Sequence, residues 1–156
     1  MRKTTRIFKF ILCLVIFESF LINPSSAFLP NINEPNQEEF ESTAKKIGKT
    51  AIQLIQFGQN DEAVKLLRLA VKLHPNEIDL WTSLAEAQTR SNRHDQALSS
   101  LNQAQKLNPK KQSIYLKKAS IYMNLDDPKK AKISIKKSLS INKNNEKGYF
   151  QLGNAE

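Results

Sequence analysis

His74, His94 and Cys13 have the most chemically versatile side chains of this sequence. His74 precedes Pro75 and His94 lies in a polar segment, so either imidazole is a candidate general base or proton switch. The alternative is that both histidines are exposed residues at a helix end or in a turn. Because no nucleophile lies near either of them, we favour the alternative and expect a protein that is not an enzyme. Cys13 belongs to an apolar run and is interpreted as one of its apolar residues, without a chemical role.

The composition excludes further classes of site. Two His and one Cys in 156 residues are too few for a multi-histidine metal site or a cysteine-based zinc site. Four Gly and six Pro argue against a Gly-rich phosphate loop and against a turn-dense β-sandwich. We therefore expect no metal, no cofactor and no small-molecule substrate, whereas 40% hydrophobic residues predict a folded core.

An internal repeat organises the elements around these residues. Ala63, Ala97 and Ala131 recur with a period of 34. Four further columns keep the same step: Ala51, Ala85, Ala119 and Gly153; Leu67, Leu101 and Ile135; Trp81, Tyr115 and Tyr149; and Pro75, Pro109 and Lys143. Such a period predicts an array of small stacked units.

Each repeat has the pattern of two short amphipathic helices joined by a polar turn. In the second repeat, apolar residues recur with helical spacing over 81–88 and again over 97–107. Asp95 is expected to cap the later helix, which Pro109 ends because proline cannot donate the next hydrogen bond. The alanines of the repeat columns allow helix backbones to approach closely. An additional stretch of helix is expected to begin near Gln37.

The pattern resembles that of the tetratricopeptide repeat (TPR) family. The matching residues are Ala51, Leu54, Ala63, Leu67 and Pro75; Trp81, Leu84, Ala85, Ala97, Leu101 and Pro109; and Tyr115, Ala119, Tyr122, Ala131 and Ile135. The resemblance covers about Ala44 to Glu156 and implies an all-α helix-turn-helix solenoid. Within a domain spanning 37–156, we expect three repeats, at about 44–77, 78–111 and 112–145, and the first helix of a fourth at 146–156.

The last repeats depart from the family pattern. Lys118 replaces a core leucine and Lys143 replaces the final proline, so we expect the third repeat to pack less tightly than the others. Tyr149, Phe150 and Leu152 are unlike the polar residues of a capping helix. They indicate either a makeshift cap or a piece of a longer array, and we favour the second.

In the TPR family, the first helix of each repeat lines a concave groove that binds a peptide or helix of a partner. The resemblance places these residues in the groove: Ile52, Ile55, Gln56, Asp79, Thr82, Glu86, Thr89, Arg90, Leu116, Ser120, Met123 and Phe150, with Lys147 beside the last. Some members bind the C-terminal carboxylates of chaperones through a Lys/Asn/Arg clamp. Gly48 and Ile52 occupy matching places here and leave Lys117 as the one cation, so this activity is not expected.

Charge is unevenly distributed along the chain, whose formal net charge is +9. Residues 28–102 carry 8 cations and 10 anions, whereas residues 103–156 carry 12 cations and 4 anions. A basic patch occupies the second helix of the third repeat: Lys129, Lys130, Lys132, Lys136 and Lys137. It is a candidate contact for a membrane or an acidic protein, although a solvated surface is the simpler interpretation. No aromatic residues interleave the lysines, so no nucleic acid is expected as a partner.

Residues 1–27 have the features of a targeting segment. Four cations within positions 2–9 precede an apolar stretch that is shorter than the roughly 20 residues of a spanning helix. Ser25 and Ala27 fit removal of an export signal, and the alternative is an uncleaved anchor over residues 7–22. Residues 28–36 are expected to be a linker. We expect the protein to be exported, to a compartment of the periplasm or thylakoid-lumen type, or to be membrane-anchored.

These features predict a non-catalytic scaffold that binds a partner peptide or helix in its groove. Exported bacterial TPR proteins of this size, including those of cyanobacterial type, resemble assembly factors for envelope or photosynthetic-membrane complexes. Two alternatives remain open: the regulatory N-terminal TPR module of a longer enzyme, and a peripheral membrane protein that acts through its lysine-rich face.

Overall fold

The computed structural model describes residues 37–155. This part of the chain contains seven α-helices and no strand: α2 (Gln37–Gln56), α3 (Asn60–Leu73), α4 (Ile78–Arg90), α5 (His94–Leu107), α6 (Gln112–Asn124), α7 (Pro128–Ile141) and α8 (Glu146–Gly153). The prediction of an all-α fold is confirmed for these residues. The expected targeting segment and linker lie outside them.

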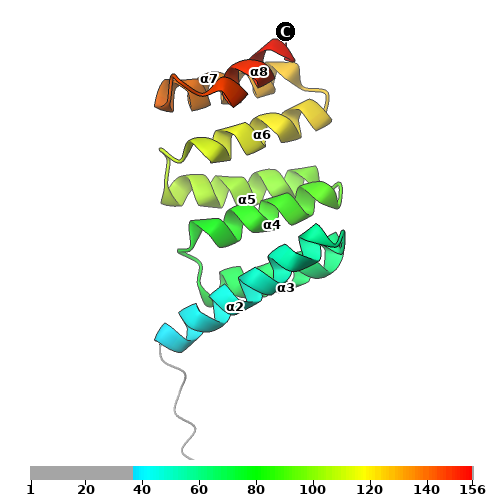
Figure 1. Ribbon diagram of the computed structural model, residues 1–156, viewed down its shortest axis with the longest axis vertical. Helices are drawn as coiled ribbons and strands as arrows, with labels where there is room; N and C mark the ends of the chain where they lie inside the picture. The colour runs from blue at the N-terminus through cyan, green and yellow to red at the C-terminus, as the bar shows by residue number, and fades with distance from the viewer. Residues whose placement is uncertain (1–36, 156) are drawn as a thin grey trace, which may run out of the picture. The chain divides into compact units, whose positions relative to one another are not determined.

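Consecutive helices pack as hairpins (Figure 1). Helix α2 packs against α3, α4 against α5, and α6 against α7, while α8 packs against α7. Residues Pro35–Glu156 form one compact unit, and its described residues contain three hydrophobic core clusters. Three helical hairpins followed by one helix confirm the predicted solenoid.

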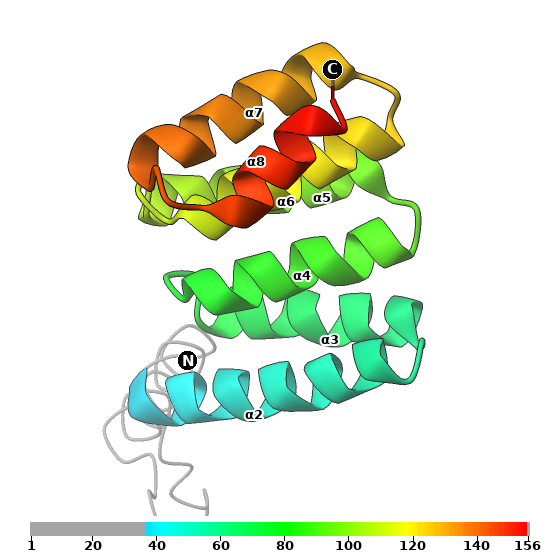
Figure 2. The same ribbon diagram turned by 45° about the horizontal axis from the view of Figure 1, so that its top comes forward.

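Contacts between neighbouring hairpins separate the helices into two layers (Figure 2). Glu86 of α4 pairs with Lys117 of α6, so the first helices of these two hairpins adjoin one another. Arg68 of α3 donates a hydrogen bond to Gln96 of α5 at 2.8 Å, so the second helices adjoin in the same way. We call the two sets the first-helix layer (α2, α4, α6, α8) and the second-helix layer (α3, α5, α7).

The turn inside each hairpin has the same backbone geometry from one repeat to the next. Gly58, Asn92 and Asp126 have φ values of 78°, 58° and 54°, in the left-handed region. In each turn, this residue's N–H donates to the carbonyl three residues earlier, and the following N–H donates to the carbonyl five residues before it. This is a Schellman motif, for which Gly, Asn and Asp are the least strained residues. The turn geometry therefore recurs with the same period of 34 residues as the buried core positions.

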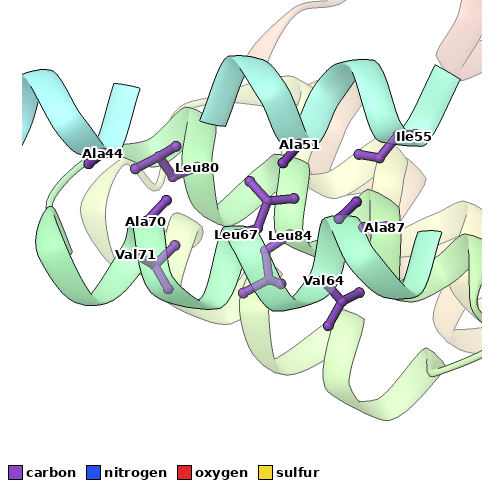
Figure 3. Close-up of a cluster of buried hydrophobic side chains, with 11 residues drawn as sticks. Ala44, Ala51, Ile55, Val64, Leu67, Ala70, Val71, Leu80, Leu84 and Ala87 are labelled. Carbon is purple, nitrogen blue, oxygen red and sulfur yellow. The ribbon is translucent and has the colours of Figure 1, made fainter. Parts of the chain in front are cut away.

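Small residues let the helices of the first core cluster pack closely. Leu67 of α3 is fully buried there, with Ala51 of α2 and Leu84 of α4 beside it (Figure 3). A Cβ atom on Gly48 would lie 2.6 Å from Cδ2 of Leu80, so a larger residue at this position would force the Leu80 side chain to move.

Two aromatic residues of the repeat column join α4 and α6 to the loops before them. Trp81 donates its Nε1–H to the carbonyl of Pro75 at 2.6 Å. At the corresponding position of the next repeat, Tyr115 donates its hydroxyl to the carbonyl of Pro109 at 2.7 Å. Trp81 also packs against the first and second core clusters, so it serves packing.

The second hairpin contains one buried polar pair. Gln88 of α4 lies on the apolar face and accepts a hydrogen bond from Oγ of Ser100 on α5 at 2.7 Å. The predicted cap of α5 is wrong, because the residue before the helix is Arg93, which makes no side-chain capping bond. Asp95 lies instead in the first turn of α5, where its charge interacts favourably with the positive end of the helix dipole.

Polar contacts accompany apolar packing where the second and third hairpins meet. Lys118 of α6 is half-buried and donates to Oδ1 of Asn102 at 2.6 Å and to Oε1 of Gln105, both on α5. Burial lowers the pKa of Lys118. Helices α5 and α6 pack less extensively against each other than α3 and α4 do.

Candidate functional site

A pocket of about 360 Å³ opens on the first-helix layer and is lined from α4, α5, α6 and α8. Its lining residues are Ala85, Glu86, Thr89, Arg90, Leu101, Lys117, Ser120, Ile121 and Lys147. We call it the groove pocket. The structure brings five of the predicted groove residues together here: Glu86, Thr89, Arg90, Ser120 and Lys147.

Glu86 organises the charges of the groove pocket. Its Oε2 accepts a hydrogen bond from Nζ of Lys117 at 2.8 Å, and its Oε1 accepts one from Arg90 at 3.3 Å. The bond from Lys117 lowers the pKa of Glu86, and the charges of Lys117 and Arg90 act in the same direction against the effect of partial burial. Glu86 is therefore ionised at neutral pH and holds both cations at the pocket.

The lining of the groove pocket combines positive charge with apolar surface. Three cations face one carboxylate, so the net charge is positive. Leu101 and Ile121 contribute buried apolar side chains. Ser120 accepts a hydrogen bond from Nε2 of Gln151 at 3.0 Å, which joins α6 to α8 at the pocket. This lining suits a ligand that offers an acidic group beside a small apolar one.

The other predicted groove residues lie on the helices of the same layer. Asp79 of α4 pairs with Lys111 at 2.5 Å. The prediction for Thr82 is wrong, because this residue is buried and its hydroxyl donates to the Asp79 carbonyl at 3.1 Å. The rest are Ile52 and Gln56, exposed on α2; Leu116, half-buried on α6; Met123, exposed on α6; and Phe150, exposed on α8. These residues do not line the groove pocket.

The prediction for Ile55 is wrong. Ile55 is only 5% exposed and belongs to the first core cluster. The buried face of α2 carries Ala44, Gly48, Ala51 and Ile55, which recur at helical spacing, so the side chain of Ile55 points inward with them (Figure 3). Its neighbour Ile52 lies on the exposed side of the same helix.

Sequence reasoning missed the apolar part of the groove pocket. Leu101 and Ile121 lie on helix faces whose spacing marks them as core, and both are buried in the second core cluster. Their second role arises only where α4, α5 and α6 meet. The spacing of apolar residues along one helix cannot show that a core residue also lines a pocket between helices. Lys117 lies on the first helix of the next repeat and pairs with Glu86. The repeat register could have identified it as a groove residue.

All five lysines of the basic patch lie on α7, in the second-helix layer. Lys130 pairs with Asp127 at 2.8 Å, and Asp127 also caps α7 by accepting from the backbone N–H of Lys130. The pair lowers the pKa of Asp127 and raises that of Lys130. Nζ of Lys130 lies 5.7 Å from the ring centroid of Tyr122. None of these lysines lines the groove pocket.

The two histidines lie at helix ends. His74 follows the last residue of α3 and His94 is the first residue of α5, and both are half-buried. Within residues 37–155, no three His, Cys, Asp or Glu side chains are grouped so that they could hold a metal ion. No helix in that range has the length and apolar character needed to cross a membrane.

Comparison with known families identifies the repeat. Two family models, both described as tetratricopeptide repeat, match residues 54–110 and 112–145. Together these matches cover more than half of the chain. No curated protein shows significant sequence similarity to it.

Solved TPR structures share the fold. The first TPR of Spaghetti (RPAP3), bound to the HSP90 peptide SRMEEVD, is 22% identical with a TM-score of 0.69, covering 74% of this chain and 91% of that chain. The Arabidopsis OM64 TPR domain is 16% identical (TM-score 0.70; 75% and 97% covered). The Yersinia enterocolitica secretion chaperone SycD, in complex with a YopD peptide, is 13% identical (TM-score 0.68; 73% and 92% covered). The first match spans α3, α4 and α5, and the second spans the α6–α7 hairpin; this chain therefore belongs to the tetratricopeptide repeat family.

Proposed function

We propose that this TPR protein is a non-catalytic interaction scaffold whose groove pocket binds an acidic segment of a protein partner. The observation that carries the proposal is the lining of the pocket, where three cations and one carboxylate surround buried apolar side chains. An acidic group of the partner would pair with Arg90 and Lys117, and an adjoining apolar side chain would contact the aliphatic stems of the cations that line the pocket.

Similar structures support peptide binding by this fold. The RPAP3 domain is bound to an HSP90 peptide whose sequence, SRMEEVD, ends in acidic and apolar residues, and SycD is in complex with a peptide of YopD. The preference for an acidic segment in this chain rests on its own cations at the groove pocket.

A binding assay with defined peptides tests the proposal. Fluorescence anisotropy would compare a labelled ten-residue peptide of alternating Glu and Leu with a twin in which Gln replaces Glu. We expect the acidic peptide to bind more tightly, and the double variant Arg90→Gln/Lys117→Gln to weaken it at least tenfold through loss of two charge-assisted hydrogen bonds. The matched control is Lys65→Gln/Lys72→Gln on α3, which removes the same charge from positions outside the pocket.

Two outcomes would contradict this function. The first is equal binding of the acidic peptide and its neutral twin. The second is an equal loss of affinity in the groove and control variants, which would reduce the effect to overall charge. Affinity capture from native membrane extract, with the same three proteins as baits, would then identify a partner by its loss from the groove variant alone.

The cellular role proposed here is assembly of an envelope or photosynthetic-membrane complex by an exported or membrane-anchored bacterial protein. The cations and apolar run of residues 1–27 support it, as does the small-residue pair before position 28. Mass spectrometry of the N-terminus in cell fractions tests it. A mature chain beginning at Phe28 in an exported fraction fits the proposal, and an intact Met1 in the cytosol contradicts it.

A further inference from the structure

The outer face of α7 carries an exposed isoleucine among four lysines. Ile133 is 68% exposed, the largest exposed fraction of an aliphatic side chain on this helix. Lys129, Lys130, Lys136 and Lys137 lie four and three residues before it and three and four residues after it, and all are exposed. This spacing places the four cations around Ile133 on one side of the helix.

The repeat supplies an internal control for this arrangement. At the same five positions, α3 has Asp61, Glu62, Lys65, Arg68 and Leu69, and α5 has Asp95, Gln96, Ser99, Asn102 and Gln103. The hairpin therefore folds with acidic, neutral or mixed residues at these places. The concentration of lysines around an exposed isoleucine in the third repeat is not a requirement of the fold.

Most of the positive charge on this face is uncompensated. Lys130 pairs with Asp127, and Lys129 is close enough for its charge to lower the pKa of that carboxyl group. Lys136 and Lys137 take part in no ion pair within the described part of the chain. The inner face of α7 is occupied by packing against the array, through the buried residues Ala131, Ser134, Ile135 and Ser138.

We infer that the outer face of α7 binds the surface of an anionic lipid bilayer, with Ile133 inserted between headgroups and the lysines bound to their phosphates. A flat bilayer can contact one protruding apolar side chain and all four surrounding cations at once, and lysine stems reach past the insertion level to the headgroups. The charge is complementary to anionic lipid. Helix α7 itself carries no aromatic side chain on which a nucleic-acid base could stack, and the Tyr122 ring near Lys130 belongs to α6.

This contact is compatible with the proposed function because it uses the other layer. The groove pocket is lined from α4, α5, α6 and α8, whereas the lysines lie on α7. Membrane binding by α7 therefore leaves the cations of the groove pocket available to a protein partner. The two activities are separable by mutation.

Vesicle co-sedimentation tests the inference. The protein is residues 35–156, a compact unit with its own core, which omits the cationic apolar N-terminus that would bind membranes itself. We expect binding to vesicles of one part phosphatidylglycerol and two parts phosphatidylcholine, no binding to pure phosphatidylcholine, and weakening as salt rises. The variant Lys129→Gln/Lys136→Gln/Lys137→Gln should bind at least tenfold more weakly. Ile133→Ser should also weaken binding while retaining its salt dependence.

The matched control is Lys46→Gln/Lys65→Gln/Lys72→Gln, which lowers the net charge equally at positions of α2 and α3. It should bind anionic vesicles within twofold of the parent protein. Equal loss in the control and α7 variants would overturn the inference, as would binding to polyglutamate or duplex DNA without binding to vesicles. Arg90→Gln/Lys117→Gln should retain vesicle binding, so failure of the groove proposal remains distinguishable.

Thermal melts of every variant establish that it is folded. The unsubstituted full chain on vesicles gives a second reading, through amine labelling of Lys136 and Lys137. These lysines should be protected on anionic vesicles and labelled freely on neutral ones. Equal labelling on both would contradict the inference independently of sedimentation.

Discussion

Single residues in this array act through backbone geometry and short-range pairing. Gly58, Asn92 and Asp126 close the three hairpins in the same left-handed conformation. The pairing of Glu86 with Lys117 joins two hairpins and sets the charge of the groove pocket. A single substitution can remove either feature without creating a cavity. The contribution of each feature to the free energy of unfolding can therefore be measured separately.

We predict that Gly58→Ala lowers the free energy of unfolding by about 1 kcal/mol, because an L-residue with a Cβ is strained at positive φ. No atom lies within 4 Å of the position that the new Cβ would occupy, so this loss is one of backbone strain rather than collision. Gly58→Asn should cost less than Gly58→Ala, since asparagine tolerates this conformation. Chemical denaturation of both variants checks the order, and a smaller loss for alanine than for asparagine would contradict it.

The lowered pKa of Glu86 predicts a pH-dependent contribution to stability. A carboxyl whose pKa is lower in the folded state stabilises the fold above its ordinary pKa, and this contribution is lost as pH falls through the lowered value. The Glu86 and Lys117 side chains are each 38% exposed, so solvent screening keeps the contribution below about 1 kcal/mol. Melts should show Glu86→Gln less stable than the parent at pH 7 and equal to it at about pH 2. A difference that persists in acid would refute this assignment.

At the scale of the elements, helices are more predictable from the sequence than the sites between them. Alanine columns and helical spacing predict the hairpins, because burial of one helix face is a property of one segment. The prediction for Ile55 fails because two adjacent turns of α2 carry isoleucine, and packing against α3 and α4 decides which one is buried. The groove pocket depends on four helices, so its apolar lining could not be predicted from any one of them.

The buried Gln88–Ser100 pair predicts non-additive substitutions between α4 and α5. Ser100→Ala leaves the Gln88 carboxamide oxygen without its partner, and should lower the free energy of unfolding by about 1–3 kcal/mol. Gln88→Leu should leave the Ser100 hydroxyl unpaired. The double variant should therefore lose less than the sum of the two single losses. A double-mutant cycle by denaturation measures the difference, and strict additivity would show that the pair contributes nothing.

At the scale of the whole array, stability depends on the junctions between hairpins. The junction of α5 with α6 is less extensive than that of α3 with α4 and contains the half-buried Lys118. The sequence predicts looser packing in the third repeat from this same residue. Within the third repeat this prediction is wrong, because α6 and α7 pack as extensively as α4 and α5. The less extensive contact lies at the junction, where Lys118 contacts Asn102 and Gln105 of the preceding hairpin.

We predict that the third hairpin opens before the first two. Native-state hydrogen exchange should show lower protection in α6 and α7 than in α3 and α4, with a step between residues 107 and 112. Lys118→Leu should add apolar contact with α5 and raise protection in α6. Uniform protection across all three hairpins would contradict the prediction. Protection in α6 unchanged by Lys118→Leu would show that Lys118 is not the cause.

The recurring turn geometry makes one repeat a unit of gene duplication. A second copy of residues 78–111 inserted after Lys111 would bring its own Schellman turn at Asn92, its own Trp81 contact and another Asp79–Lys111 pair. The junction that contains Lys117 and the groove pocket would then lie one hairpin further along the chain. Descendants of such a duplication would differ in length and in the position of the pocket, while every hairpin kept the same turn and the same packing.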